Sequence, residues 1–162
     1  MELKFAVSLR CGKWEYWIGN RSSWTHSNVD SGIRARAEWT HIQLDFISNF
    51  VDFYVNGVKV HNTIQNRNSG SGDGFGLTLG AWWSDNNGSF SGEIDELKIW
   101  SESRTTNVTN DMHIRGDTSN ANLLAYWDFN EPSGTTIYDR KSSRNLTAMR
   151  DSSLRLDVKQ VR

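Results

Sequence analysis

The sequence contains one cysteine, Cys11, and one proline among 162 residues. A single cysteine excludes an intramolecular disulfide. The longest apolar runs are far shorter than the roughly eighteen residues that a membrane-spanning helix needs, so we expect no membrane insertion. A chain of this length can bury about two thirds of its unfolded surface. It therefore needs neither a disulfide nor a metal ion to fold as one domain.

The sequence also lacks an excess of charge of either sign. The formal net charge is −1, with 18 basic and 19 acidic residues mixed along the chain. Proteins that bind nucleic acid through phosphates concentrate Lys and Arg on one face or in one block. The absence of such a block excludes nucleic acid as an expected partner.

Aromatic residues are abundant, by contrast, with eight Trp, seven Phe and four Tyr within a hydrophobic fraction of only 36%. Aromatic side chains dominate both cores and recognition surfaces. We therefore expect some of them in the core and others exposed for recognition.

Glycine-containing turn clusters, spaced about every eight to twelve residues, predict many short strands. The strand predictions cover residues 3–9, 14–18, 75–83, 90–100, 123–129, 135–139 and 154–158. An Asn-, Ser- and Gly-rich loop is predicted at residues 62–74. One short helix is predicted at about residues 105–114, where Val108 and Met112 share a face.

The clearest local signal is a hairpin within residues 40–60, where apolar and polar residues alternate on both sides of Asn56-Gly57. This dipeptide favours a type I′ turn because both central residues need a positive φ. The segment therefore predicts two antiparallel strands joined at Asn56-Gly57.

Three stretches together resemble the laminin G-like, concanavalin A-like jelly-roll family. They are EWTHIQLDFISNFVDFYVNGVKV (residues 38–60), FSGEIDELKIWSESRT (residues 90–105) and LLAYWDFNEPSGTTIYDRKSSRNLTA (residues 123–148). The resemblance implies an all-β fold, a two-sheet antiparallel jelly-roll sandwich with one short helix. It also implies that residues 1–162 form a single laminin G-like domain.

The order of the three stretches departs from the family pattern, because the third usually opens such a domain and here it closes the chain. Two interpretations follow. The sequence is a repeat cut out of register, or its last strands fill the place of the usual first ones. We favour the second interpretation, since residues 154–158 could occupy the missing strand position.

The resemblance also implies one calcium site, since the family often carries one. The matching positions are Asp95, Asp128 and Asp139. Hard cations such as Ca²⁺ take carboxylate and carbonyl oxygens from loops. The alternative is that these aspartates cap turns or face solvent.

The most suggestive surface segment is AWWSDNNGSF, residues 81–90. An exposed indole can stack on a sugar ring while neighbouring carboxylate and amide groups bond its hydroxyls. The predicted ligand-binding residues are Trp82, Trp83, Asp85, Asn86 and Asn87, with Trp24 in a polar loop as a second site. The alternative is that these tryptophans clamp loops onto the sandwich.

Catalytic patterns are weak. Glu93 and Asp95 would share one face of a strand, as the carboxylates of glycoside hydrolases do, but the next residue on that face is Leu97. A bulge at this point would re-aim the acids. The tripeptide at residues 115–117 is the one that integrins read, but three residues make a very weak motif.

These observations predict a non-catalytic carbohydrate-binding or adhesion module, assisted by calcium if the implied site is real. Its expected partner is a glycan or glycoprotein, and its expected location is extracellular or at the cell surface within a longer protein. The first alternative is a structural domain that binds neighbouring domains or copies of itself. A glycoside hydrolase is the less favoured alternative.

Overall fold

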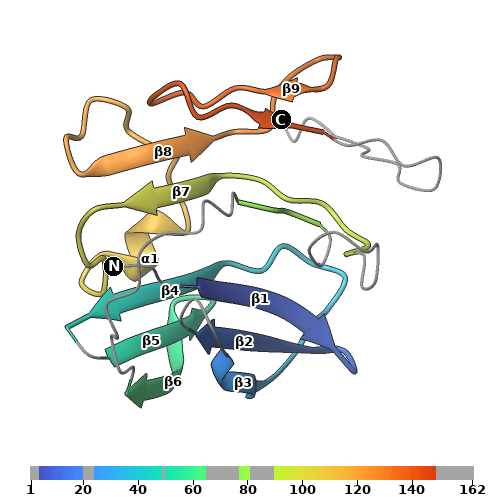
Figure 1. Cartoon of the computed structure of the whole chain (residues 1–162), viewed down its shortest axis with the longest axis vertical. Coiled ribbons are helices and arrows are strands. Elements are labelled where there is room, and N and C mark those ends of the chain that lie inside the picture. Colours follow the sequence, from blue (N-terminus) through green and yellow to red (C-terminus); the bar gives the residue numbers. More distant parts are fainter. Residues whose placement is uncertain (1–3, 20–23, 49, 65–76, 81–89, 149–162) are drawn as a thin grey trace. The chain divides into compact units, whose positions relative to one another are not determined.

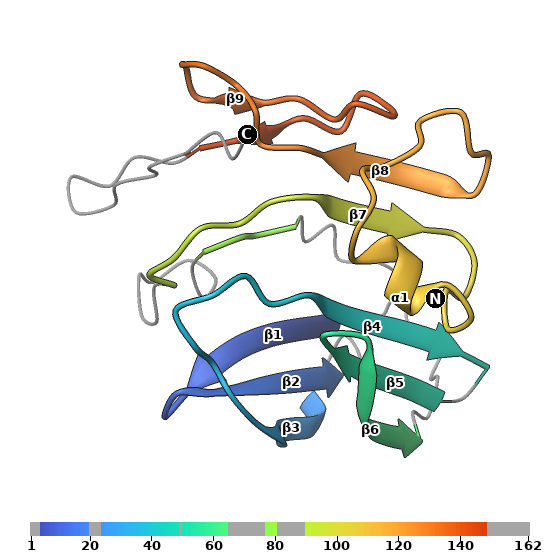
Figure 2. The same ribbon diagram turned by 180° about the vertical axis from the view of Figure 1, so that it is seen from behind.

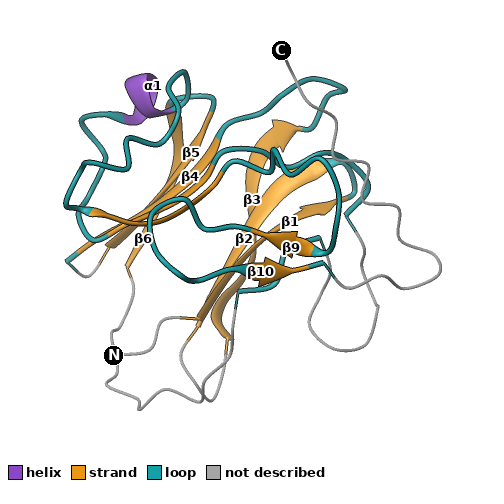
Figure 3. Cartoon of the chain, turned by 90° about the horizontal axis from the view of Figure 1, so that it is seen from above, coloured by secondary structure: helices purple, strands orange, loops and turns teal. Residues whose placement is uncertain are grey.

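The computed structural model describes residues 4–19, 24–48, 50–64, 77–80 and 90–148. Antiparallel strands account for most of its regular structure, and one short helix accompanies them (Figure 3). No helix in these ranges is long and apolar enough to cross a membrane. The chain divides into two compact units, residues 1–91 with 105–112, and residues 92–104 with 113–162. The prediction of a single domain is not tested by this division and stays a prediction.

The first unit contains two three-stranded antiparallel sheets (Figure 1 and, from behind, Figure 2). The β1–β3 sheet has β1 (Lys4–Arg10), β2 (Lys13–Gly19) and β3 (Trp24–Arg34), in that order. The β4–β6 sheet has β4 (Ile42–Ile47), β5 (Phe50–Val55) and β6 (Val58–Ile64), also in chain order. The helix α1 (Val108–Asp111) belongs to the same unit.

Tight turns join the strands of each sheet. The predicted Asn56-Gly57 turn is confirmed, with φ of 48° and 78° and with Val55 opposite Val58. The turn between β1 and β2 uses the same geometry at Cys11 and Gly12, where φ is 51° and 74°. Cys11 is exposed there, in a conformation that costs a residue with a Cβ more than glycine.

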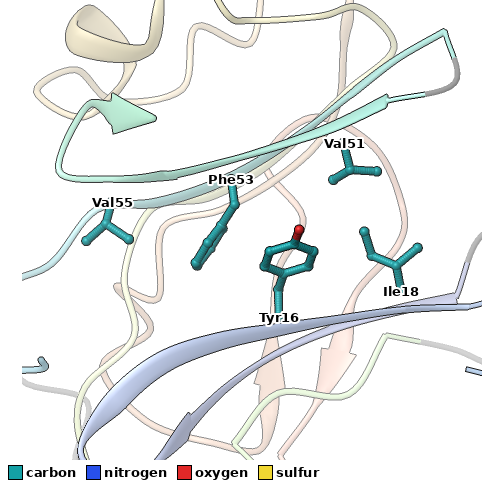
Figure 4. Close-up of a cluster of buried hydrophobic side chains, with 5 residues drawn as sticks. All are labelled: Tyr16, Ile18, Val51, Phe53 and Val55. Carbon is teal, nitrogen blue, oxygen red and sulfur yellow. The ribbon is translucent and has the colours of Figure 1, made fainter. Parts of the chain in front are cut away.

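The core of the first unit lies between the two sheets (Figure 4). Tyr16 and Ile18 project from β2 toward residues of β5, and the Tyr16 and Phe53 ring centroids are 5.0 Å apart. The buried cluster consists of Tyr16, Ile18, Val51, Phe53 and Val55. Side chains alternate along a strand, so these apolar positions assign every intervening residue of β2 and β5 to the reverse face.

Strand β3 was not predicted from the sequence. Trp24, expected in a polar loop, is instead the first residue of β3. The pairing of β3 with β2 is interrupted by register shifts. One interruption coincides with Asp30-Ser31-Gly32, where Gly32 has φ of 74° and donates its N–H to the Asp30 carboxylate. Such polar, bulged residues do not show the regular alternation on which strand prediction depends.

The second unit contains two antiparallel strand pairs. Strand β7 (Leu97–Trp100) pairs with β8 (Leu123–Trp127), and β9 (Thr136–Ile137) pairs with β10 (Leu146–Thr147). The predicted strand 123–129 is therefore largely confirmed. The predicted strand 90–100 is wrong before Leu97, because Glu96 adopts φ of 55° and interrupts extended backbone.

Other predicted elements are shorter in the structure than expected, or lie partly outside the described residues. The helix predicted at residues 105–114 is limited to Val108–Asp111, since Asn and Asp have low helix propensity. Residues 62–64, predicted as loop, belong to β6, and residues 77–80 do not form the predicted strand. The remainder of the predicted loop, and the strand predicted at 154–158, lie outside the described residues.

We predict that Phe53→Ala removes the central contact between the sheets and lowers the free energy of unfolding by about 3–5 kcal/mol. Phe53 is fully buried against Tyr16, so truncation leaves a cavity. Val58→Ala is the control, because Val58 is 64% exposed. Urea unfolding followed by tryptophan fluorescence would measure both, and equal losses would contradict this account of the core.

Candidate functional site

The predicted aromatic ligand surface falls almost wholly outside the described residues. Trp82, Trp83, Asp85, Asn86 and Asn87 all lie within residues 81–89. Their predicted role stays a prediction.

The predicted calcium residues lie in the second unit, where Asp139 has a structural role. Its carboxylate accepts hydrogen bonds from the Tyr126 N–H at 3.0 Å, the Lys141 N–H at 2.9 Å and the Ser142 hydroxyl. Burial alone would raise the pKa of Asp139, but these bonds outweigh it and lower the pKa to about 2. Asp139 therefore ties β8 to the turn that follows β9.

Asp128 and Asp95 also have partners in the protein. The Asp128 carboxylate accepts a hydrogen bond from Arg140 Nε at 2.8 Å. One oxygen of Asp95 accepts a bond from the Glu96 N–H at 2.8 Å. Within the described ranges, no three His, Cys, Asp or Glu residues gather as a metal-ligand set. Protein donors occupy Asp139 and Asp128, so the trio does not fit a calcium cradle, and calcium binding stays a prediction of the family resemblance.

The tripeptide at residues 115–117 is explained by packing within the second unit. A Cβ added at Gly116 would lie 2.7 Å from the Tyr126 ring, so only glycine fits there. Asp117 accepts hydrogen bonds from the N–H and the hydroxyl of Ser119, at 2.9 and 2.7 Å. These contacts account for the glycine and the aspartate without an adhesion partner.

A group of polar side chains lies in the first unit on the outer face of the β4–β6 sheet, away from the core. Asp45 is directly opposite Asp52 across β4 and β5, Gln43 is opposite Tyr54, and Tyr54 is opposite Lys59. Val51, Phe53 and Val55 point into the core, so their neighbours in β5 point outward. We call this group the Asp52 cluster, consisting of Gln43, Asp45, Asp52, Tyr54, Lys59 and Asn62.

Asp52 is the centre of the cluster. Its carboxylate accepts hydrogen bonds from Lys59 Nζ at 2.8 Å, from the Tyr54 hydroxyl at 3.2 Å and from Asn62 Nδ2. Asp52 is only 3% exposed. Burial alone would raise the pKa of Asp52, but the bonds from Lys59 and Asn62 hold it below its ordinary value. The carboxylate is therefore ionised at neutral pH and orients its three donors.

The exposed members of the cluster can contact a ligand. The Lys59 side chain is 49% exposed, and Asn62 is exposed as well. An ammonium group has three N–H donors and a carboxamide has an acceptor oxygen, so the pair offers both kinds of hydrogen-bonding group beside one another. The Gln43 side-chain nitrogen is buried without a hydrogen-bond partner in the described part of the chain. Such an arrangement suits a neutral, hydroxyl-rich ligand.

Sequence reasoning treated these residues only as the polar half of an alternating pattern. The turn at Asn56-Gly57 already fixes Val55 opposite Val58, and hence Tyr54 opposite Lys59. A register count from this turn could have placed Lys59 beside Tyr54. The bulge after Phe53 shifts the remaining pairs, so it could not have placed Asn62 opposite Asp52.

Comparison with known proteins now places the chain in a family. Residues 2–107 match a laminin G model described as "Concanavalin A-like lectin/glucanases superfamily". The chain belongs to this superfamily. The resemblance found in the sequence and the predicted sandwich class of fold are thereby confirmed.

One solved structure matches the fold of this concanavalin A-like chain. It is described as a "putative carbohydrate binding protein" from Bacteroides ovatus. The two share 17% sequence identity with a TM-score of 0.57, over 91% of this chain and 47% of the other. The chain thus spans about half the length of that protein, and the likeness concerns the fold alone. No curated protein matches the sequence.

Since the superfamily includes glucanases, the pKa values of the carboxyl groups bear on whether any of them could act as a catalytic acid. A retaining glycoside hydrolase needs a nucleophile and an acid about 5 Å apart, and the acid has a raised pKa. Asp52 and Asp128 have lowered pKa values. Partial burial raises the pKa of Asp95, and the charges of Glu96 and Asp128 add to it. Glu96, the residue after Asp95, accepts a hydrogen bond from the Tyr126 hydroxyl at 2.7 Å.

We predict that Asp139→Asn destabilises the protein in a pH-dependent way. The pKa of Asp139 is about 2 in the fold against 3.8 for an ordinary aspartate. The carboxylate therefore stabilises the fold by about 2 kcal/mol above pH about 4, and this contribution is lost as the pH falls toward 2. The measurement is the unfolding free energy of both proteins between pH 7 and 2. The difference in unfolding free energy between the two proteins should become smaller as the pH falls.

The matched control for this prediction is Asp117→Asn. Asp117 also accepts two hydrogen bonds from a nearby serine, but it is exposed. Its substitution should change stability far less at every pH. If the loss of unfolding free energy in Asp139→Asn is the same at every pH, the charge of Asp139 is not the stabilising feature.

Proposed function

We propose that this domain is a non-catalytic carbohydrate-binding module and that the Asp52 cluster contacts the glycan. The observation that carries the proposal is the buried Asp52 carboxylate, which orients the exposed groups of Lys59 and Asn62 on one sheet face. Polar groups that are fixed before binding lose little conformational entropy when a ligand arrives. The description of the Bacteroides ovatus neighbour supports the same class of function.

The charges of the cluster favour an uncharged glycan. Two carboxylates, Asp45 and Asp52, lie opposite one another, and Lys59 is the cation paired with Asp52. Because the exposed charge of Lys59 is already paired with Asp52, the cluster offers little attraction to a sulfated or uronic-acid chain. We infer that neutral oligosaccharides bind here.

The module is proposed to act outside the cell or at the cell surface, as part of a longer protein. Laminin G-like relatives typically do so. The aromatic surface predicted from the sequence at Trp82, Trp83, Asp85, Asn86 and Asn87, with Trp24, remains a separate proposal for the same activity. Calcium at Asp95, Asp128 and Asp139 stays an expectation of the family resemblance and is not part of this proposal.

A second candidate is the structural one, in which the domain binds neighbouring domains or another copy of itself. Among the described strands, β1 lies at the edge of its sheet, and its side chains Phe5, Val7 and Leu9 are exposed although they share the face of the core residues. An exposed row of large apolar side chains on a sheet edge favours protein contacts. Concentration-dependent self-association in the ultracentrifuge, abolished by Val7→Lys, would support this candidate.

We predict that Lys59→Gln and Asn62→Ala each weaken the binding of a neutral oligosaccharide about tenfold, because each removes a hydrogen bond to a hydroxyl. A glycan array of neutral and acidic oligosaccharides would select the probe, and calorimetry would measure its affinity. Lys13→Gln is the matched control, since Lys13 forms a similar pair with Asp30 at 2.6 Å on the other sheet. Unchanged affinity in both cluster variants would refute the assignment.

We further predict that glycan affinity is the same with calcium and with EDTA. The expected calcium ligands Asp139 and Asp128 already accept hydrogen bonds from protein groups, so calcium has few free oxygens to bind at this trio. Calorimetry in the two buffers measures the effect. A loss of binding in EDTA would instead support the calcium site implied by the family resemblance.

A further inference from the structure

The loop before β4 presents an exposed indole. Trp39 is 53% exposed, whereas the buried core residues of the same unit point between the sheets. An exposed indole offers a large apolar face on which a ring can stack. In this position it is available to a ligand.

The backbone beside Trp39 is held in place by the β5–β6 turn. The His41 N–H donates to Asn56 Oδ1 at 2.8 Å, and the Asn56 N–H donates to the His41 carbonyl at 2.9 Å. The Thr40 hydroxyl donates to the Glu38 carbonyl at 3.4 Å. These bonds limit the motion of the backbone on the C-terminal side of Trp39, which lowers the entropy lost when a ligand binds there.

Trp39 lies two residues before His41. The bonds between His41 and Asn56 continue the β4–β5 ladder one residue beyond Ile42. Alternation puts His41 on the same face as Gln43 and Asp45, and Trp39 lies in the loop just before it. Lys59 and Asn62 lie on β6, two strand spacings or about 10 Å from β4, a distance greater than one sugar ring.

We propose that a linear neutral oligosaccharide crosses the outer face of the β4–β6 sheet, with hydroxyls of one sugar on Lys59 and Asn62 of β6 and a further ring stacked on Trp39 before β4. The proposal rests on the proposed function and adds the size of the ligand: the site recognises a run of several sugars, not a single terminal one. Indole faces and the C–H faces of pyranose rings exclude water from each other. The polar cluster orients the sugar through hydrogen bonds, and the indole provides apolar contact area. Ligand sites commonly combine these two features.

The test is a size series, from one to six sugars, of four neutral glycans: β-1,3-glucan, β-1,4-glucan, β-1,4-mannan and β-1,4-xylan. Calorimetry measures the affinity of the whole chain for each member. For the glycan that binds, we expect affinity to rise once the oligosaccharide is long enough to reach Trp39. Trp39→Ala should weaken the affinity for the long oligosaccharides about tenfold and leave the affinity for the shortest one that binds unchanged.

Two further variants separate stacking from other effects. Trp39→Tyr keeps an aromatic face and should retain much of the gain with length. Tyr138→Ala removes an aromatic side chain that is similarly exposed, at 50%, in the other unit, and should change nothing. Far-ultraviolet circular dichroism of each variant checks that the fold is intact.

The outcomes distinguish this proposal from the proposed function. Equal affinity for short and long members, or an equal loss at every length in Trp39→Ala, overturns the extended site while carbohydrate binding stands. The absence of binding to every neutral glycan overturns both. Loss of binding in Lys59→Gln together with no effect of Trp39→Ala on long members also overturns the extended site alone.

Discussion

The contact between β2 and β5 is the constraint on which the first unit depends. Tyr16 and Phe53 meet across the sheets with their rings tilted by 51°, and the Tyr16 hydroxyl lies 2.5 Å from His61 Nδ1. This hydrogen bond satisfies a polar group within an apolar layer. Because Phe53 must face Tyr16, Asp52 and Tyr54 must face the other way. The packing of the core therefore determines which residues of β5 lie on the outer face of the sheet.

That outer face places two carboxyl groups opposite one another. Asp45 and Asp52 are directly opposite, an arrangement that destabilises a sheet unless it is compensated. Lys59 and Asn62 stabilise the Asp52 charge, and Asp52 also raises the pKa of Tyr54, after the larger effect of burial. The tyrosine therefore remains a hydrogen-bond donor over a wide pH range. The fixed orientation of the exposed Lys59 and Asn62 groups is the basis of the binding role proposed for the cluster.

The extent to which the sequence predicted this structure depended on how regular each segment is. Alternation and the Asn56-Gly57 dipeptide predicted the β5–β6 hairpin because both signals are local. The division of the preceding segment into β4 and β5 was not predicted. The bulged strand β3 was not predicted, since Asp30-Ser31-Gly32 resembles a turn. The Asp52 cluster was not predicted either, because its members come from three strands and the bulge after Phe53 sets their register. Residue type alone does not reveal such a cluster.

The aspartates of the second unit also show that residue type alone does not predict a residue's role. Asp139 matches a family calcium position, yet a carboxylate that accepts several N–H and O–H bonds and one that binds a cation carry the same sequence signal. Its bonds to Tyr126, Lys141 and Ser142 lower the pKa to about 2, as a cation would also do. The two roles differ only in the partners of the carboxylate. In this structure the partners of Asp139 are protein donors, and its charge holds β8 to the turn after β9.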